Sequence, residues 1–485
     1  MAVALLFKAQ AVRAGGVVTA FQQGKPLPKE VLTDVQLKSV VAEFLDPDRT
    51  ELGREIAYVV WREILTAISD QKGAGVIIAR APEGVRLTDL LQADYHQAAI
   101  KVAESQRARM AVWGAVDEEG GRLLVDTYLS MVGDTRSAEL AVKLLWGLPG
   151  DLKDSGFTTR LSRTAFNFPR VSTTREALFV RPLTAQGKSS IRDRPVDGAV
   201  IGSVADGDLL QADGMKGGWF RIRMKDGRQG FVDAWKVYVP PTQVEALRDP
   251  GGGDLKLRGG IEANAQVVSR VPPASLLAVL QSRYTPGRGL WYRVRAPQGE
   301  GWVPATAVLA RFSFPVVHFV AGLYRYQLGR YGDAAREFEE YVRSDGVAAD
   351  PASLSSAYQM LAASRLMTGS FWGGSGAGAT FKSVDEYIAL AARTTPFDPS
   401  VHSLAAVATI ARTMSIGQAL PSLERALELD SENADARALL RRMVVLLSPA
   451  PAGPISMAES LVRSEGTPAL RAKLDALDKR YGDMK

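Results

Sequence analysis

The chain has 485 residues, 46% of them hydrophobic and 23% charged, which is long and apolar enough for three or four globular domains. It contains no cysteine, and this excludes disulfides, thiolate nucleophiles and cysteine metal sites. The net charge of +6 comes from residues 180–312, where 19 Lys and Arg face 12 Asp and Glu, an excess that favours anionic partners but is too mixed in sign to indicate nucleic acid.

Residues 1–135 alternate strand and helix signals in the order β-α-β-α-β-β, which predicts an α/β layer domain. The predicted helices are Leu52–Ser69 and Leu90–Arg107, and the predicted strands are Val3–Gln10, Gly75–Ala79, Arg109–Val116 and Leu123–Leu129. The last two strands flank the sequence DEEGG, which is typical of a hairpin turn.

This first domain resembles the amino-terminal domain of TolB and FlgO-like envelope proteins. The resemblance rests on VIIAR at Val76–Arg80 and on the hairpin at Ala108–Leu129, and it extends over Val3–Val132. The first strand departs from the family pattern because it lacks the usual Pro-Phe ending. The resemblance implies a domain that mediates protein contacts and performs no catalysis.

A short helix is expected at Ser137–Leu148 and a linker over the rest of 136–178. Beyond it lie two copies of one pattern, Trp219-Phe220-Arg221-Ile222-Arg223 and Trp291-Tyr292-Arg293-Val294-Arg295, each followed by Gly, an aromatic residue and Val. Strand alternation places the Trp and both Arg on one face and the other two residues on the opposite face. The spacing predicts two small β-barrels, at 179–240 and 254–312, separated by a linker at 241–253, and the sequence DPGGGD, Asp249–Asp254, marks the boundary between the copies.

Both copies resemble the bacterial SH3 (SH3b) module. The first carries Ile191-Arg192, Val200–Val204, Gly207-Asp208 and Asp226–Val232, whereas the second lacks the Gly-Asp and Asp-Gly pairs, so its turns are expected to differ. The resemblance implies a module that binds peptides or peptidoglycan stems, or that only spaces other domains.

Two interpretations of the repeated face remain open. In the first, the tryptophans form a groove for an extended peptide and the arginines face its carboxylates. In the second, these positions are barrel core and a solvated basic strand. The candidate residues are Trp219, Arg221, Arg223, Trp291, Arg293, Arg295 and Trp302.

Residues 313–447 change to a helical period and resemble tetratricopeptide (TPR) repeats. The expected small and large positions are occupied by Gly322, Leu328, Gly329, Tyr331, Ala334 and Phe338. The predicted helices cover Val316–Gly346 as a pair, then Leu354–Thr368, Ser383–Arg393, Val401–Met414, Leu420–Leu429 and Asn433–Leu447, with a helical tail at 448–485.

The TPR resemblance implies a solenoid whose concave surface receives a partner's peptide. Arg325, Arg336 and Arg365 are the candidates to line it, with solvated helix arginines as the alternative. The glycine-rich Gly373–Thr380 lacks the Lys-Ser/Thr of a phosphate-binding loop and is expected to be an insertion between helices.

No catalytic constellation is visible in the sequence. His96, His318 and His402 fall in three predicted helices without carboxylates at metal-ligand spacing, and no nucleophile elbow or kinase signature is present. We therefore expect no enzymatic activity, no cofactor and no bound metal.

No apolar run reaches the ~20 residues that span a bilayer, so no transmembrane segment is expected. The amino terminus, MAVALLFKAQAVRAGG, is a poor signal peptide because it lacks a basic start. The expected compartment is therefore the periplasm or cell envelope if a leader has been removed, and otherwise the cytoplasm.

Together these patterns predict a multidomain α+β protein with an α/β domain, two SH3-like barrels and a TPR-like helical solenoid. The leading hypothesis is a non-enzymatic scaffold or adaptor that docks proteins in a bacterial envelope assembly. The alternatives are a peptidoglycan-binding envelope protein and a cytoplasmic adaptor or regulatory subunit of a larger complex.

Overall fold

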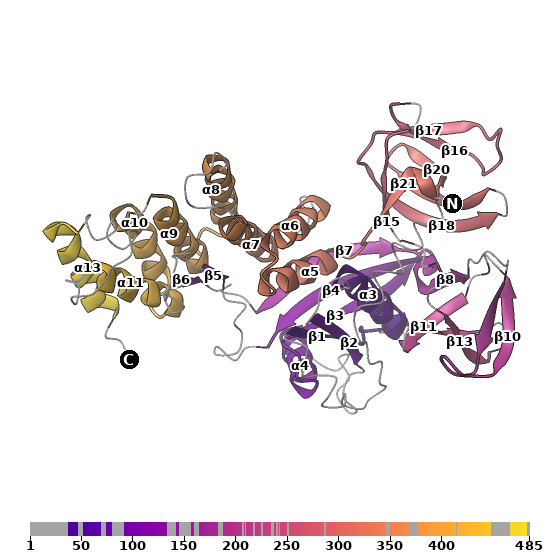
Figure 1. Ribbon diagram of the computed structural model, residues 1–485, viewed down its shortest axis with the longest axis horizontal. Coiled ribbons are helices and arrows are strands. Elements are labelled where there is room, and N and C mark those ends of the chain that lie inside the picture. The colour runs from indigo at the N-terminus through magenta and orange to yellow at the C-terminus, as the bar shows by residue number, and fades with distance from the viewer. Residues whose placement is uncertain are drawn as a thin grey trace. The chain divides into compact units, whose positions relative to one another are not determined.

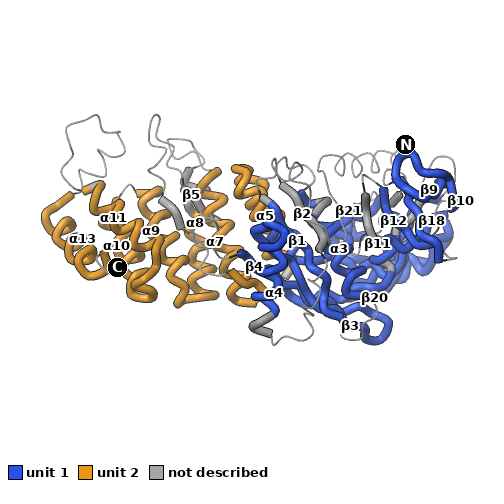
Figure 2. The backbone as a smooth tube through the Cα atoms, turned by 90° about the horizontal axis from the view of Figure 1, so that it is seen from below, with its two compact units in different colours: residues 1–132, 168–320 blue, residues 133–167, 321–485 orange. Residues whose placement is uncertain are grey.

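The computed structural model divides the chain into two compact units, one of residues 1–132 and 168–320 and the other of residues 133–167 and 321–485 (Figure 2). The structure describes residues 37–46, 52–68, 74–79, 92–132, 142–144, 157–159, 164–182, 188–205, 208, 210–216, 219–224, 227–233, 237–238, 241, 243–249, 252–285, 288–345, 350–368, 377–413, 415–447 and 466–482.

The first unit opens with a five-stranded sheet in the order β2-β1-β3-β4-β7 (Figure 1). Its strands are β1 (Leu37–Ala42), β2 (Ala74–Ala79), β3 (Met110–Glu119), β4 (Arg122–Met131) and β7 (Ala165–Thr173). Strand β1 lies between β2 and β3 and is parallel to both, whereas β3 and β4 form an antiparallel hairpin. Helices α3 (Leu52–Ile68) and α4 (Gln92–Ser105) pack on this sheet and bury its aliphatic residues.

The structure confirms both helices, the strand at Gly75–Ala79 and the hairpin predicted for this region. The strand predicted at Val3–Gln10 lies outside the described residues. Strand β1 was not predicted, because its sequence Leu-Lys-Ser-Val-Val-Ala has neither a clean alternation nor a long apolar run. Val40 and Val41 of β1 are nevertheless fully buried, one toward each face of the sheet.

Two predictions between residues 136 and 178 are wrong. The predicted helix Ser137–Leu148 contains strand β5 (Val142–Leu144), which pairs with β6 (Phe157–Thr159) in the second unit. The predicted linker contains β7, an outer strand of the five-stranded sheet. Pro169 is tolerated in β7 because β7 is an edge strand, one side of which needs no ladder hydrogen bonds.

A polar-aromatic cluster joins α4 to the β3–β4 hairpin. The rings of Trp113 and Tyr128 stack with their centroids 4.4 Å apart, and the ring of His96 meets Trp113 edge-on at 5.0 Å. Ser130 is fully buried beneath them, where its Oγ accepts a hydrogen bond from Trp113 Nε1 at 2.9 Å and lies 2.8 Å from His96 Nδ1. One hydroxyl thus satisfies two ring nitrogens.

Replacing Ser130 with alanine should therefore lower the free energy of unfolding by about 1–3 kcal/mol, because the buried indole N–H loses its acceptor. Replacing the exposed Ser105 of α4 with alanine should change it by less than about 0.5 kcal/mol. Urea unfolding followed by tryptophan fluorescence measures both. Equal effects would show that the Ser130 hydroxyl has no special role.

Two seven-stranded antiparallel sheets follow in the same unit, and we call them module A and module B (Figure 1). Module A runs in the order β10-β9-β13-β12-β11-β8-β14 and module B in the order β17-β16-β20-β19-β18-β15-β21. The strands of module A are β8 (Phe179–Pro182), β9 (Lys188–Arg192), β10 (Val200–Ala205), β11 (Leu210–Lys216), β12 (Trp219–Arg223), β13 (Gln229–Asp233) and β14 (Val237–Tyr238). Those of module B are β15 (Gln243–Ala246), β16 (Leu255–Arg258), β17 (Val267–Val271), β18 (Leu276–Thr285), β19 (Gly289–Ala296), β20 (Gly299–Pro304) and β21 (Val308–Arg311).

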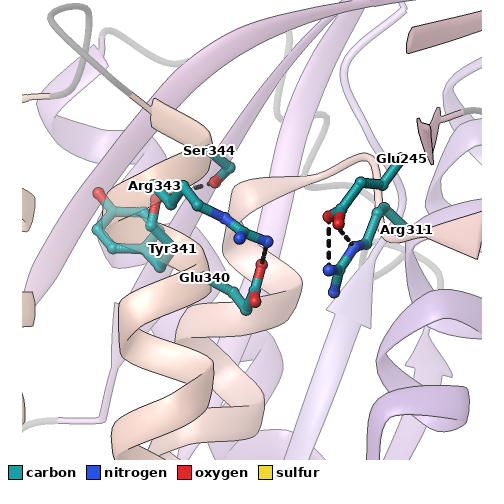
Figure 3. Close-up of polar contacts among 6 residues, drawn as sticks. All are labelled: Glu245, Arg311, Glu340, Tyr341, Arg343 and Ser344. Atoms are coloured by element: carbon teal, nitrogen blue, oxygen red, sulfur yellow. Dashed lines mark hydrogen bonds and ion pairs between the residues drawn. The ribbon is translucent and has the colours of Figure 1, made fainter. Parts of the chain in front are cut away.

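The two orders match strand for strand, so the duplication reaches beyond the repeated sequence to the whole module. This corrects the linker predicted at 241–253, because β15 is a paired strand of module B that contacts both β18 and β21. The described residues of the DPGGGD stretch lie between β15 and β16 of module B, and Gly252 and Gly253 have φ of +86°. Glu245 and Arg311 reinforce the β15–β21 pair with an ion pair of 2.6 Å (Figure 3).

The glycine that precedes the repeated aromatic residue is required by packing in both modules. A Cβ on Gly230 would lie 2.3 Å from Ile191 Cγ2, and one on Gly301 would lie 2.7 Å from the Cβ of Leu257. Both contacts are too short for any side chain, so this glycine lets the two neighbouring strands approach over the core.

The second unit contains most of the helical region, in which each helix packs against the next from α6 to α11. The helices are α5 (Pro315–Gln327), α6 (Tyr331–Asp345), α7 (Pro351–Thr368), α8 (Ala377–Thr394), α9 (Pro399–Thr413), α10 (Ile416–Leu429), α11 (Ala434–Leu447) and α13 (Pro468–Tyr481). All the helices predicted after residue 312 are confirmed, and α13 confirms a helix in the tail. Residues 369–376, which include the first half of the glycine-rich stretch, lie outside the described residues.

No helix in the described ranges combines the length and the apolarity needed to cross a membrane.

Candidate binding faces of the two β modules

The repeated strands β12 and β19 bury one face and present the other outward. Phe220, Ile222, Tyr292 and Val294 are at most 5% exposed and belong to the cores of the modules. The alternate residues, Trp219, Arg221, Arg223, Trp291, Arg293 and Arg295, are all half-buried or exposed. The predicted alternation is confirmed, and the tryptophans and arginines lie outside the core.

On this outer face, residues from three adjacent strands form a row of arginine, aromatic residue and arginine. In module A, Phe231 of β13 lies opposite both Arg192 of β9 and Arg221 of β12. In module B, Trp302 of β20 lies in the same way between Arg258 of β16 and Arg293 of β19. We call these sets the arginine rows, and their positions are equivalent in the two modules.

The first arginine of each row holds the turn that follows its strand. Arg192 Nη1 donates to the carbonyl oxygen of Gly198 at 2.6 Å, and Arg258 Nη1 donates to that of Ala265 at 3.2 Å. The guanidinium of Arg192 also lies 5.9 Å from the ring centroid of Trp219, a cation–π contact. Arg192 matches the SH3b pattern in the sequence, but neither Arg192 nor Arg258 was among the predicted site residues.

Each row is accompanied by a pair of aromatic residues on the same face. Trp219 lies opposite Asp233, two residues beyond Phe231, and Trp291 lies opposite Pro304, two residues beyond Trp302. Residues in such diagonal positions on antiparallel strands are near enough for large side chains to interact. Each module therefore offers a half-exposed aromatic pair beside its guanidinium groups.

In module B, two arginines of the outer face, Arg293 and Arg295, are hydrogen-bonded to a carboxylate of the chain itself. Glu300 on β20 accepts hydrogen bonds from Arg293 Nη2 at 3.0 Å, from Arg295 Nη2 at 2.6 Å and from Arg295 Nε at 2.8 Å. The Arg295 hydrogen bonds, followed by the charges of both arginines, hold the pKa of Glu300 below its usual range. Because all three side chains are at least 31% exposed, this cluster adds little to stability.

In module A the equivalent position holds Gln229, which lies opposite Arg223 as Glu300 lies opposite Arg295. The amide of Gln229 carries no charge, and Arg223 makes no ion pair with any residue in the described part of the chain. The charged Glu300 of module B therefore has an uncharged counterpart, Gln229, in module A.

The helix arginines predicted to line a concave surface each contact a carboxylate within the second unit. Arg325 pairs with Glu337 at 3.2 Å, Arg336 with Asp333, and Arg365 with Glu339. Another arginine of α6, Arg343, likewise forms an ion pair with Glu340 at 2.5 Å (Figure 3). These contacts favour a structural role for the three arginines, of which Arg336 and Arg365 are exposed to solvent whereas Arg325 is only 15% exposed.

The three histidines lie on α4, α5 and α9, as the sequence predicts. His96 belongs to the Trp113 cluster, the ring of His318 lies 5.5 Å from that of Phe312, and His402 Nε2 lies 3.2 Å from the carbonyl oxygen of Pro396. Among the described residues, no group of three or more His, Cys, Asp or Glu is arranged to hold a metal ion.

No protein-family model matches the chain. A search of curated proteins gives no match. Among solved structures, NlpC2 from Trichomonas vaginalis is 11% identical over 28% of this chain and 48% of that chain, with a TM-score of 0.15. NlpC1 from the same organism is 11% identical over 32% of this chain and 49% of its own, with a TM-score of 0.14.

A PelC dodecamer from Paraburkholderia phytofirmans is 18% identical over 23% of this chain and 69% of that chain, with a TM-score of 0.14. This chain spans about half the length of the two NlpC chains. These partial likenesses assign neither a family nor an activity.

Proposed function

We propose that this protein is a non-enzymatic scaffold or adaptor that docks protein partners through its SH3b-like β modules and its TPR-like helical region. The observation that carries the proposal is the duplicated outer face of modules A and B, with its arginine row and aromatic pair. Guanidinium groups beside half-exposed aromatic rings suit the recognition of an extended peptide that carries carboxylates. The bacterial envelope is the proposed setting, on the strength of the TolB-like, SH3b and TPR resemblances together.

The β modules, more than the helical region, are the proposed docking sites. The candidate arginines of α5, α6 and α7 already contact carboxylates of the chain, so a partner would have to displace these ion pairs. On the outer face of module B, Glu300 likewise contacts Arg293 and Arg295, but these three side chains are at least 31% exposed and their ion pairs add little to stability. A ligand on these outer faces would contact the side chains without disrupting the hydrophobic core of either module.

Affinity capture with the full chain tests this proposal. We expect wild type to retain a defined protein partner and the variant Trp219→Ala/Arg221→Ala/Arg223→Ala to lose it, while a variant with Arg336→Ala retains it. Retention of the partner by wild type and by both variants would contradict the adaptor proposal. Binding of isolated peptidoglycan sacculi in place of a protein would also contradict it.

A further inference from the structure

The outer face of module B combines two tryptophans with arginines over four adjacent strands, β16, β20, β19 and β18. Trp302 of β20 lies between Arg258 of β16 and Arg293 of β19. Trp291 of β19 lies opposite Arg283 of β18. All five side chains are half-buried or exposed, so a ligand can reach them.

The arginines of this face differ in what they already contact. Glu300 of β20 accepts hydrogen bonds from Arg293 and Arg295. Arg258 donates one hydrogen bond, at 3.2 Å, to a backbone carbonyl oxygen of the loop that follows β16. The exposed side chain of Arg283 makes no hydrogen bond or ion pair with any residue in the described part of the chain. Within the described residues, a carboxylate thus covers the Arg293 and Arg295 side of the face and reaches neither Arg258 nor Arg283.

Charge complementarity selects an acidic ligand for this face. Among the residues of the four strands, Glu300 is the one carboxylate, whereas four arginines and Lys256 carry positive charge. Lys256 is paired with Asp249, and Glu300 offsets one arginine, so a positive excess remains. Asp254 and Glu262 lie just before and after β16, so this excess is centred on β18 and β19.

Glu300 also indicates which anionic group suits these arginines. Its Oε1 accepts two hydrogen bonds from Arg295, at 2.6 and 2.8 Å, and its Oε2 accepts one from Arg293 at 3.0 Å. Hydrogen bonds between a guanidinium group and a carboxylate are directional and stronger than those between neutral groups. A carboxylate supplied by a partner would make the same contacts with the arginines that Glu300 does not reach.

We propose that the outer face of module B binds an extended segment of a partner protein in which two acidic residues flank an apolar residue, each separated from it by one other residue. This inference rests on the proposed function and specifies the face and its ligand. One ligand carboxylate lies on Arg283 and the other on Arg258. The apolar side chain packs between them against Trp291 and Trp302.

The separation of the two arginines sets the spacing of the ligand. Arg258 on β16 and Arg283 on β18 are three strand intervals apart, which is about 14 Å at about 4.8 Å for each interval. In an extended peptide, residues four positions apart are about 13 Å apart and point to the same side as the residue midway between them. Because Trp302 and Trp291 lie on the two intervening strands, that middle residue meets the aromatic pair.

Peptide binding to the full chain tests the inference. The probe is the fluorescent peptide Gly-Ser-Glu-Ser-Leu-Ser-Glu-Ser-Gly, blocked at both ends, and fluorescence anisotropy at low ionic strength gives its affinity. A peptide of the same composition, Gly-Ser-Ser-Glu-Leu-Glu-Ser-Ser-Gly, has the same charge with the wrong spacing and should bind at least about fivefold more weakly. Replacing the central Leu of the probe with Ser should weaken binding at least about threefold, because the contact with the tryptophans is lost.

Arg283→Gln should weaken binding of the probe about tenfold, because a charge-assisted hydrogen bond is lost, and this change corresponds to about 1.4 kcal/mol. The exposed position of Arg283 makes a loss of folding unexpected, and circular dichroism of the variant checks it. Arg248→Gln is the matched control, since Arg248 is an exposed arginine of module B outside the four strands. It removes the same charge and should change the affinity less than about twofold.

Three results would overturn the inference: no binding of the probe by wild type, equal binding of the rearranged peptide, or equal affinities of Arg283→Gln and Arg248→Gln. Binding of an oligonucleotide or of peptidoglycan sacculi that depends on Arg283, without binding of the acidic peptide, would overturn the choice of a protein ligand. If affinity capture with wild type retains a protein partner but the probe does not bind, the proposed function stands and this inference fails.

Discussion

Replacing Phe338 with alanine should lower the free energy of unfolding of the helical region by about 3–5 kcal/mol, the range for removing a fully buried aromatic ring. Phe338 of α6 is completely buried. Its ring carbons lie 2.8–2.9 Å from where a Cβ of Gly322 on α5 would stand, so the ring fills the close approach of these two helices. Urea unfolding followed by far-ultraviolet circular dichroism measures the loss.

The same contact predicts the behaviour of Gly322. Gly322→Ala should destabilise by about 1–3 kcal/mol, because the added methyl group overlaps the Phe338 ring. Gly332→Ala is the matched control on an exposed helix position, where the nearest atom is 3.7 Å away, and it should be neutral or stabilise by up to about 1 kcal/mol. In the Phe338→Ala background the cost of Gly322→Ala should largely vanish, and simple additivity would contradict this account of the helix pair.

Replacing Glu63 with glutamine should make the stability of the first unit much less dependent on pH. Glu63 lies on α3, and its Oε2 accepts hydrogen bonds from the backbone N–H groups of Ser313 at 3.0 Å and Phe314 at 3.5 Å, just before α5 begins. Desolvation raises the pKa of Glu63 from 4.5 to about 7, although these hydrogen bonds and the nearby Arg62 act in the opposite direction.

The direction of the pH effect follows from this raised pKa. Between about pH 4.5 and 7 the folded state holds a proton that the unfolded state has released, so folding becomes less favourable as the pH rises through this window. The loss reaches about 3 kcal/mol above pH ~7, at about 1.4 kcal/mol for each unit of pKa difference. A glutamine keeps an oxygen acceptor for the two N–H groups and carries no charge.

Denaturant midpoints of wild type and Glu63→Gln at about pH 4 and about pH 8 measure this, and we expect the variant to gain relative to wild type at the higher pH. Glu104→Gln, an exposed glutamate of α4, should leave the pH profile unchanged. Parallel profiles for wild type and Glu63→Gln would show that Glu63 ionises normally in the folded protein.

The sequence was most informative where the pattern is periodic. Helices α3 to α11 follow from apolar residues at helical spacing, and the outward placement of Trp219 and Trp291 follows from strict strand alternation. The strands β1, β5 and β7 were missed or misassigned because they are short, mixed in polarity or interrupted by proline. Their places are set by partners that are distant in the chain.

The candidate site was predictable only in part for the same reason. The repeated strand identified Arg221, Arg223, Arg293 and Arg295, but the difference between Gln229 and Glu300 has no meaning until the strand register sets each opposite an arginine. A side-by-side alignment of the two copies contains the substitution. Only the pairing of β12 with β13 and of β19 with β20 shows that it changes the charge of the face.

The most direct test of the central claim is photo-crosslinking in cells that produce the protein, with a photoreactive phenylalanine analogue in place of Trp219 in module A or, separately, Trp291 in module B. The account predicts that the analogue crosslinks to a partner protein from at least one of these two positions. Crosslinking from neither position would contradict it.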